Sequence, residues 1–176
     1  STEETYKYIL NQSCSLKHIS PKSAYLVFMG VFHCTWLSNI NSNSSNYYMT
    51  KGYKGSSVTS CQNLDELTSY RCYRHLPLQY SYYGTGHAIY KNFLFYNQED
   101  SNNIIIYNIE TQHSIKLKGP DDAACCNIND NLYNVKHSGY FDFEVDENGL
   151  WMIYKSSKNS NSFNYEMPID EYNADY

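Results

Sequence analysis

The sequence has no cluster of basic residues and no long apolar run. Lys and Arg number 13 against 18 Asp and Glu, which gives a net charge of −5. Without a basic run, the chain has no surface of the kind that attracts a nucleic-acid backbone or an anionic membrane, so we expect neither partner. The longest apolar stretch, residues 24–31, is far shorter than the roughly 20 residues of a membrane span. We therefore expect no membrane insertion.

Catalytic motifs are also missing. The chain contains no Gly-x-Ser-x-Gly nucleophile elbow. The pair Gly84 and Gly86 lacks the third glycine and the following helix of a dinucleotide-binding loop. No spacing of Ser, His and Asp indicates a nucleophile activated by a base. We therefore expect that the protein is not an enzyme.

Aromatic residues are abundant. They make up 16 % of the chain, with 20 Tyr, and 41 % of the residues are hydrophobic. Tyr and Phe favour pleated, half-buried surfaces, so this composition favours β-structure. A chain of 176 residues is long enough for one domain with its own core. Residues 1–13 are polar and form an N-terminal segment that we expect to fray, and residues 14–176 form the domain.

Short apolar stretches separated by turn residues predict antiparallel strands. The clearest unit is four consecutive strands at Gly86–Tyr90, Leu94–Asn97, Ile104–Asn108 and His113–Leu117, which is the make-up of one β-propeller blade. A repeat of about 40–45 residues fits roughly four blades in this chain. A meandering β-sandwich fits the same pattern nearly as well.

The rest of the chain predicts further strands and one turn of helix at residues 64–67. A hairpin is expected around the turn Asp146-Glu147-Asn148-Gly149, and Pro77 is expected to end a strand. The other expected strands are Cys14–Ile19, Tyr25–Met29, Val31–Leu37, Tyr47–Thr50, Ser57–Cys61, Arg71–Leu76, Phe141–Val145, Leu150–Tyr154 and Phe163–Met167.

Three separate motifs resemble the olfactomedin domain in the order in which that family has them. They are Gly-Thr-Gly-His with the following Ala-Ile-Tyr (Gly84 to Tyr90), Tyr-Asn-Ile-Glu-Thr (Tyr107 to Thr111), and the stretch from Tyr140 to Trp151. Two positions depart from the pattern, because Tyr140 replaces an acidic residue and Glu144 a small one. The resemblance implies an all-β, five-bladed propeller of four-stranded antiparallel blades. We expect it to be incomplete, because the family's later blades have no counterpart in this sequence.

The resemblance also implies a function. Olfactomedin domains are extracellular and act by binding, so we expect an interaction module in cell-surface or matrix adhesion and signalling. Its partners are expected to be extracellular or cell-surface proteins, and the chain to be secreted or part of an ectodomain. Homo-oligomers could form through segments outside the chain. Two alternatives stay open: a glycan-binding or hydrolytic propeller, and a partial domain without independent activity.

Asp142 is the candidate metal ligand. Along residues 141–145, Phe141, Phe143 and Val145 alternate with Asp142 and Glu144, so the two carboxylates share a face. In calcium-binding olfactomedin propellers the residue matching Asp142 binds calcium, and the resemblance implies the same role here. The family's other ligands lie on segments without a counterpart here, so we expect weak calcium binding. An Asp satisfied by hydroxyl groups or water is the alternative.

Six cysteines in a Tyr-rich β-chain indicate an oxidising compartment. Cys61 and Cys72 fall on successive predicted strands and are the preferred disulfide. Cys125 and Cys126 are expected to serve separate partners, since a bond between neighbours strains the intervening peptide. Cys14 matches the family's N-terminal cysteine, whose usual partner is missing here, so the resemblance implies that it is unpaired or linked to another chain.

Other candidates have simpler interpretations. The sequons at Asn11 and Asn43 are glycosylation candidates and agree with secretion. His87 is expected to be a structural residue hydrogen-bonded between blades. Asp146 and Glu147 are expected to be solvated turn residues. A zinc site built from Cys72, His75, Cys125 and Cys126 is a minor alternative, because a second Cys-x-x-Cys or His pair is missing.

Overall fold

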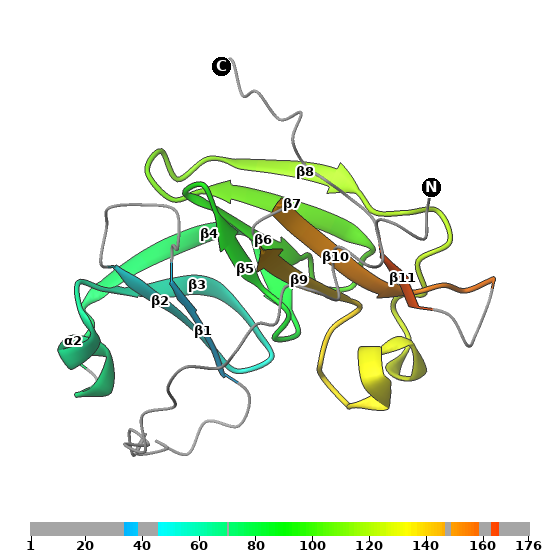
Figure 1. The fold of residues 1–176 in the computed structure, drawn as a ribbon, viewed down its shortest axis with the longest axis horizontal. Coiled ribbons are helices and arrows are strands. Elements are labelled where there is room, and N and C mark those ends of the chain that lie inside the picture. The colour runs from blue at the N-terminus through cyan, green and yellow to red at the C-terminus, as the bar shows by residue number, and fades with distance from the viewer. Residues whose placement is uncertain (1–33, 39–45, 70, 147–148, 159–162, 166–176) are drawn as a thin grey trace, which may run out of the picture.

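The structure is a computed structural model that describes residues 34–38, 46–69, 71–146, 149–158 and 163–165 (Figure 1). This part of the chain is mostly β-strand, arranged as three antiparallel sheets in sequence order. For the described residues, the prediction of an all-β fold is therefore confirmed. No helix in the described residues is long and apolar enough to cross a membrane.

The first sheet has the strand order β1-β2-β3-β4. Its strands are β1 (Cys34–Ser38), β2 (Tyr47–Lys51), β3 (Lys54–Cys61) and β4 (Arg74–Tyr83). The expected hairpin around residues 51–55 is present as the β2–β3 pair. The helix α2 (Leu64–Thr68) lies between β3 and β4, as the sequence predicted.

Asn63 caps the start of α2. The Asn63 side chain accepts a hydrogen bond of 2.8 Å from the Glu66 backbone N–H, and the Glu66 carboxylate accepts one of 2.8 Å from the Gln62 backbone N–H. The first bond satisfies one of the N–H groups that a helix start leaves without partners, and the second holds Glu66 against the residue before the cap. Leu67 is the buried residue of this turn, and it packs with Met49 and Cys61. A helix of this length is not stable by itself, so α2 depends on its cap and on the packing of Leu67.

The expectation that Pro77 ends a strand was wrong. β4 runs through Pro77 to Tyr83. β4 is the outer strand of its sheet, and its pairing with β3 is irregular between Gly55 and Ser57, where Ser57 lies opposite Pro77. An edge strand next to an irregular pairing tolerates a residue without an N–H donor.

The second sheet is the unit that the sequence predicted most clearly. Its order is β5-β6-β7-β8, all antiparallel. The strands are β5 (Ala88–Tyr90), β6 (Phe93–Asn97), β7 (Asn103–Asn108) and β8 (Ser114–Lys118). Each begins and ends within two residues of the expected bounds. The predicted four-stranded unit is therefore confirmed.

The third sheet has the order β11-β10-β9. Its strands are β9 (Phe141–Asp146), β10 (Gly149–Lys155) and β11 (Phe163–Tyr165). The predicted β9–β10 hairpin is present, and the Gly149 N–H donates to the Asp146 carboxylate at 3.1 Å. Two short 3-10 turns, Ile128–Asp130 and Leu132–Asn134, lie in the connection before β9, which the sequence analysis left unassigned.

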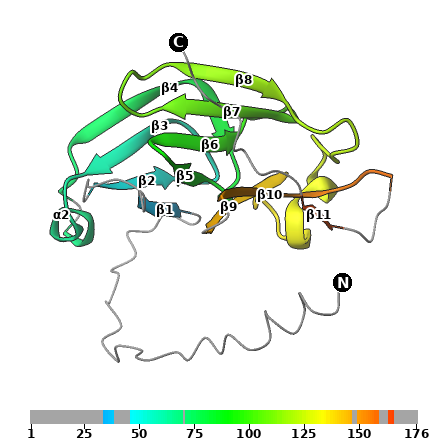
Figure 2. The ribbon, with the colours of Figure 1, turned by 45° about the horizontal axis from the view of Figure 1, so that its top comes forward.

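The first strands of the three sheets, β1, β5 and β9, lie next to one another, and the later strands extend outward from them (Figure 2). The described residues thus contain three sheets, against the roughly four blades expected for the whole chain. Two core clusters fill the spaces between the sheets. One joins the first and second sheets, and the other joins the second and third.

Strand β7 contributes to both clusters. Ile104 and Ile106 belong to the core shared with the third sheet, whereas Ile105 and Tyr107 belong to the core shared with the first. Successive side chains of a strand point to opposite faces, so this alternation buries both faces of the second sheet. It explains why the sequence of β7 is almost uniformly apolar.

Candidate functional site

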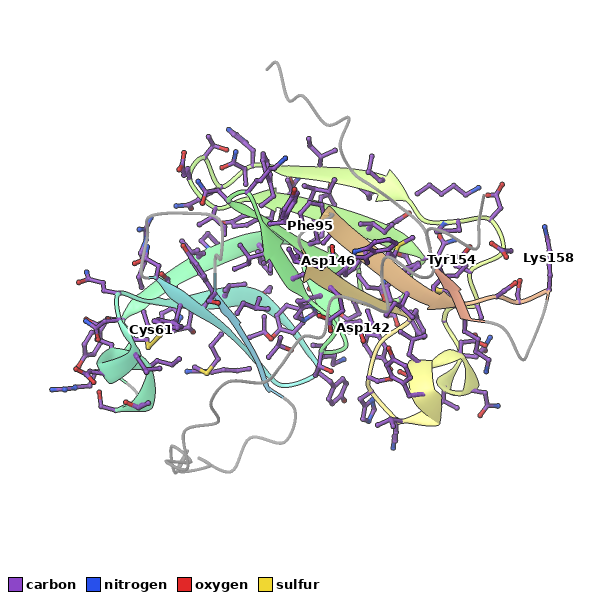
Figure 3. The ribbon with its side chains drawn as sticks, viewed as in Figure 1. Cys61, Phe95, Asp142, Asp146, Tyr154 and Lys158 are labelled. Carbon is purple, nitrogen blue, oxygen red and sulfur yellow. A yellow bond between two sulfur atoms is a disulfide. The ribbon has the colours of Figure 1, made fainter. Side chains whose placement is uncertain are left out.

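Asp142 lies on β9, the first strand of the third sheet (Figure 3). Phe141 and Phe143 on either side are buried in the core, whereas Asp142 is half-buried and Glu144 is exposed. The expected alternation, with both carboxylates on the face opposite the two phenylalanines, is therefore present in β9.

The Asp142 carboxylate has a protein partner. The Tyr133 hydroxyl donates a hydrogen bond of 2.8 Å to Oδ2 of Asp142. Tyr133 is half-exposed, and its φ of 58° is left-handed. The charge of Asp142 also acts on Glu144, whose pKa is raised by partial burial and by repulsion from Asp142. This face of β9 therefore has a negative potential.

The Gly-Thr-Gly motif brings the start of the second sheet against β9. The Phe143 N–H donates to the Gly86 carbonyl at 3.2 Å. A Cβ at Gly86 would lie 2.6 Å from the Phe141 carbonyl oxygen and 2.7 Å from Oδ1 of Asp142. At Gly84, where φ is +89°, a Cβ would lie 2.5 Å from the Gly139 Cα. Both glycines are therefore required by close backbone approach.

The described residues do not supply a complete calcium site. Calcium is bound by six to eight oxygens, usually from several carboxylates and carbonyls. No group of three or more His, Cys, Asp or Glu side chains comes together in the described part of the chain. Asp142 and Glu144 are the two carboxylates of this face, and Tyr133 already occupies one Asp142 oxygen. Asp142 and Glu144 are therefore the acidic side chains that this face offers to a cation.

The loop formed by residues 127–139 is held in place by Asn131. This buried side chain accepts hydrogen bonds from the Tyr83 hydroxyl and the Gly139 N–H, both at 3.2 Å, and it donates to the Ile128 carbonyl at 2.9 Å. The Leu132 N–H donates to the Gly139 carbonyl at 2.9 Å, which closes the loop on itself. An irregular segment with so many internal bonds holds a defined shape.

The same 127–139 loop exposes apolar side chains. Ile128, Tyr133 and Val135 are 60 %, 50 % and 52 % exposed. Three of the six large apolar side chains that are exposed in the described residues thus lie on this one loop. Exposed apolar side chains that gather in one region are typical of surfaces that contact another molecule. The loop is therefore the candidate interaction surface of the described structure.

Aromatic stacking fixes the far end of this loop. The His137 ring stacks on Tyr53 with 3.8 Å between centroids, and Tyr83 stacks on Tyr140 at 5.0 Å. Burial and the neighbouring Tyr83 raise the pKa of Tyr140 to about 12. Tyr140 is therefore a neutral residue of the core shared by the second and third sheets.

His87 is buried between the first and second sheets, as expected, but not with the expected hydrogen bonds. Neither ring nitrogen has a hydrogen-bond partner among the described residues. Instead the ring lies edge-on to Tyr82 and Tyr96, at 5.1 and 6.3 Å between centroids. Burial lowers the pKa of His87 to about 4, against a weaker opposing effect of the Gly84 backbone. Aromatic packing takes the place of polar contacts here.

Cys61 and Cys72 form a disulfide beside α2, the pairing that the sequence analysis preferred. Cys125 and Cys126 also form a disulfide with each other, so the expectation of separate partners was wrong. Both residues lie in an irregular connection, where Cys126 has a left-handed φ of 78°, so the alternation of side chains along a strand does not apply to them. With these four sulfurs bonded, the zinc alternative loses its thiolates. His75 instead lies 3.3 Å from the Thr59 hydroxyl.

The remaining candidates divide into described and undescribed residues. Asp146 is exposed at the hairpin turn, where a solvated residue was expected. Residues 1–13, Cys14, Asn11, Asn43 and Glu147 lie outside the described residues, and so do the strands expected at Cys14–Ile19 and Tyr25–Met29.

Sequence reasoning missed Tyr133, Asn131 and His137. They lie in an Asn-rich connection without periodicity, and their partners Asp142, Tyr83 and Tyr53 are distant in the sequence. The one local signal was the lack of any helix or strand pattern over about 18 residues. Such a long irregular stretch is uncommon inside a compact domain and is often functional.

A comparison with known protein families matches the olfactomedin-like domain over residues 10–167. The match includes all three motifs, the three sheets and the 127–139 loop.

Proposed function

Because the chain belongs to the olfactomedin-like domain family, we propose that it is an extracellular module that binds protein partners and has no catalytic activity. Its role is in cell-surface or matrix adhesion and signalling, either as a secreted protein or within an ectodomain. The three sheets are blades of a five-bladed propeller. Support for this arrangement comes from the neighbouring positions of β1, β5 and β9, since the first strand of each propeller blade lies nearest the central channel.

The observation that carries the binding proposal is the 127–139 loop. Ile128, Tyr133 and Val135 keep about half of their surface in water on a loop fixed by Asn131 and by stacking of His137. A preorganised loop loses little conformational entropy on binding, so its apolar contacts contribute more to affinity. Aromatic residues are also enriched at the centres of protein interfaces, and Tyr133 provides one.

An extracellular setting is supported by the cysteines. The structure has disulfides at Cys61–Cys72 and Cys125–Cys126. Disulfides persist in oxidising environments and are rare in the cytosol. The sequons at Asn11 and Asn43 agree with the same compartment.

The lack of catalysis is supported by the surroundings of the two most catalytic-looking residues. His87 is enclosed by tyrosine rings in the core, with a pKa of about 4, so it is neutral and out of reach of a substrate. Asp142 accepts a hydrogen bond from Tyr133, which satisfies one of its oxygens.

Calcium binding at Asp142 belongs to the same proposal in a limited form. Asp142 and Glu144 give this face of β9 a negative potential that favours a cation. The described donors are too few for a tight site, so calcium binds weakly.

A cell-binding experiment tests the protein-partner proposal. Fluorescent tetramers of the chain are added to cells treated either with a protease or with glycosidases. A double substitution on the loop, Ile128→Ser with Val135→Ser, removes its exposed aliphatic groups without touching Asp142. The matched control, Leu64→Ser with Tyr73→Ser, removes two exposed apolar side chains near α2.

We expect protease treatment and the loop variant to reduce binding, and the control variant to bind as the parent does. Loss of binding after glycosidase treatment alone would favour the glycan-binding alternative. Equal binding by the loop variant and the parent would remove the 127–139 loop from the interaction surface. A tetramer that folds but binds neither cells nor matrix would favour the partial domain without independent activity.

A further inference from the structure

We propose that the Cys125–Cys126 disulfide is a reversible redox site, which a dithiol reductant opens while the Cys61–Cys72 disulfide and the three sheets stay intact. The substrate class is a dithiol, either a small molecule or an oxidoreductase with two neighbouring thiols. The inference is independent of the binding partner, and it concerns the connection that leads into the 127–139 loop.

Accessibility separates the two disulfides. Cys61 is 0 % exposed and packs with Met49 and Leu67, and its partner Cys72 is half-buried against the same cluster. Cys126 is exposed, and Cys125 is half-buried against the core of the second and third sheets. Thiol–disulfide exchange requires a thiolate to approach a sulfur atom directly. Cys126 is thus the one exposed cysteine of the two disulfides, and an incoming thiolate reaches it more readily than it reaches Cys61 or Cys72.

The two disulfides also constrain very different lengths of chain. Cys61 and Cys72 are 11 residues apart and close a ring that contains α2, whereas Cys125 and Cys126 are adjacent. A disulfide stabilises the native state largely by restricting the unfolded chain, and this effect grows with the closed length. Opening the 125–126 bond therefore costs the fold little. It also frees Cys126 from a left-handed conformation, φ 78°, that residues with a Cβ rarely adopt.

Hydrogen bonds before and after the Cys125–Cys126 disulfide limit the conformational change that its reduction causes. Upstream, Asp122 accepts hydrogen bonds from the Tyr154 hydroxyl at 3.2 Å and the Ser156 hydroxyl at 2.7 Å, and the Ala124 N–H donates to the Lys155 carbonyl at 2.8 Å. Downstream, buried Asn131 fixes the loop. The segment between these contacts, residues 125–127, leads directly into Ile128, whose carbonyl Asn131 holds. Reduction therefore loosens the chain at the entry to the candidate interaction surface.

The step is a two-electron exchange. A thiolate of the dithiol attacks Sγ of Cys126, the bond between the two cysteine sulfurs breaks, and Cys125 leaves as a thiolate that takes up a proton. The second thiol of the reductant, as its thiolate, then attacks the mixed disulfide and releases Cys126. The protein gains two thiols and the reductant becomes a disulfide, so atoms and electrons balance.

The test follows the order in which the disulfides open. The oxidised full chain is first treated with N-ethylmaleimide to block free thiols. It is then exposed briefly to dithiothreitol, or to a thioredoxin-type oxidoreductase with its electron supply, and alkylated with iodoacetamide. Peptides produced without further reductant are analysed by mass spectrometry. We expect iodoacetamide on Cys125 and Cys126 to appear at least about tenfold faster than on Cys61 and Cys72.

Hydrogen exchange provides the second readout. On partial reduction, we expect faster exchange in peptides covering residues 125–130 and unchanged exchange in β7. The Cys125→Ser, Cys126→Ser double variant should exchange as the reduced protein does and should not respond to dithiol. The Cys61→Ser, Cys72→Ser double variant is the matched control and should still respond at residues 125–130.

Three results would overturn the proposal. N-ethylmaleimide on Cys125 or Cys126 before reduction, or a peptide joining either to another cysteine, would mean that the neighbouring bond does not exist. Opening of Cys61–Cys72 first or at the same rate would mean that the 125–126 bond is not selectively accessible. Increased exchange in β7 would mean that the change spreads into the core.

Discussion

The Tyr133 hydroxyl lies 2.8 Å from Oδ2 of Asp142 and donates a hydrogen bond to it. This bond links the candidate interaction loop, residues 127–139, to the candidate metal ligand on β9. A molecule that displaces Tyr133 also frees a carboxylate oxygen on β9. A partner that binds the 127–139 loop at Tyr133 would therefore also change the hydrogen bonding of Asp142.

Removal of this hydroxyl tests the link. Tyr133→Phe keeps the exposed ring but leaves the Asp142 oxygen without its donor. We expect the free energy of unfolding to fall by about 0.5–1 kcal/mol, because the bond joins a neutral donor to a partly hydrated carboxylate. Urea unfolding measures the change, with the exposed Tyr73→Phe as the control. Equal stability of the two variants would show that the bond contributes nothing in solution.

Calcium is expected to stabilise the chain only slightly. If Kd is no lower than the calcium concentration, binding to the native state adds about 0.4 kcal/mol or less. Millimolar calcium should therefore raise Tm very little, and Asp142→Ala should abolish whatever rise is seen. The control is Asp146→Ala, which removes an exposed carboxylate from the end of the same strand. A large calcium-dependent shift in the parent would contradict the partial donor set.

His87 should make stability fall in mild acid. Its pKa is lowered to about 4 in the folded protein, below the ordinary value of 6.5, so between these two values the unfolded chain binds more protons. The stability from keeping His87 neutral is fully present above about pH 6.5 and is lost as the pH falls towards 4. The shift corresponds to about 3 kcal/mol.

Unfolding free energies measured from pH 7 to pH 4 give this dependence, and His87→Gln removes the titrating group. The comparison uses the slope against pH, so it is independent of any overall loss of stability in the variant. We expect the parent to show the steeper decline. Identical slopes for parent and variant would mean that His87 does not titrate in this range.

Gly84 should be far less tolerant of a side chain than Gly52. Both have left-handed φ, +89° and +79°. An added Cβ meets the Gly139 Cα at 2.5 Å in the first case and nothing closer than 3.8 Å in the second. Gly52→Ala therefore measures the backbone penalty alone, and Gly84→Ala adds steric overlap worth about 1–3 kcal/mol. Thermal melting of both variants should show the larger loss for Gly84→Ala, and similar losses would rule out the close approach.

The sequence predicted those strands and the helix that a local residue pattern determines. The second sheet follows from apolar runs and short turns, and one turn of helix was predicted at residues 64–67, where α2 lies. The prediction that Pro77 ends a strand failed because an outer strand can contain a proline. The position of β4 at the edge of its sheet cannot be read from the local sequence. The prediction of separate partners for Cys125 and Cys126 failed because their pairing depends on the left-handed backbone at Cys126, which the sequence does not indicate.

The candidate site was predictable only in part. Alternation alone put Asp142 on the face opposite Phe141 and Phe143. Its partner Tyr133 lies in a segment without periodicity, and a left-handed φ there gives no sequence signal for tyrosine. Likewise, the burial of His87 followed from its position before a strand, but enclosure by Tyr82 and Tyr96 required the packing of two sheets.

The double burial of β7 has a mechanical consequence. If a pulling force detached either outer sheet, Ile104 and Ile106 on one face, or Ile105 and Tyr107 on the other, would become wet at once. Neither the first nor the third sheet can therefore be detached without weakening the second sheet, which packs against both. Under tension the described part of the chain should rupture as a single unit, giving one force peak in place of a series of steps.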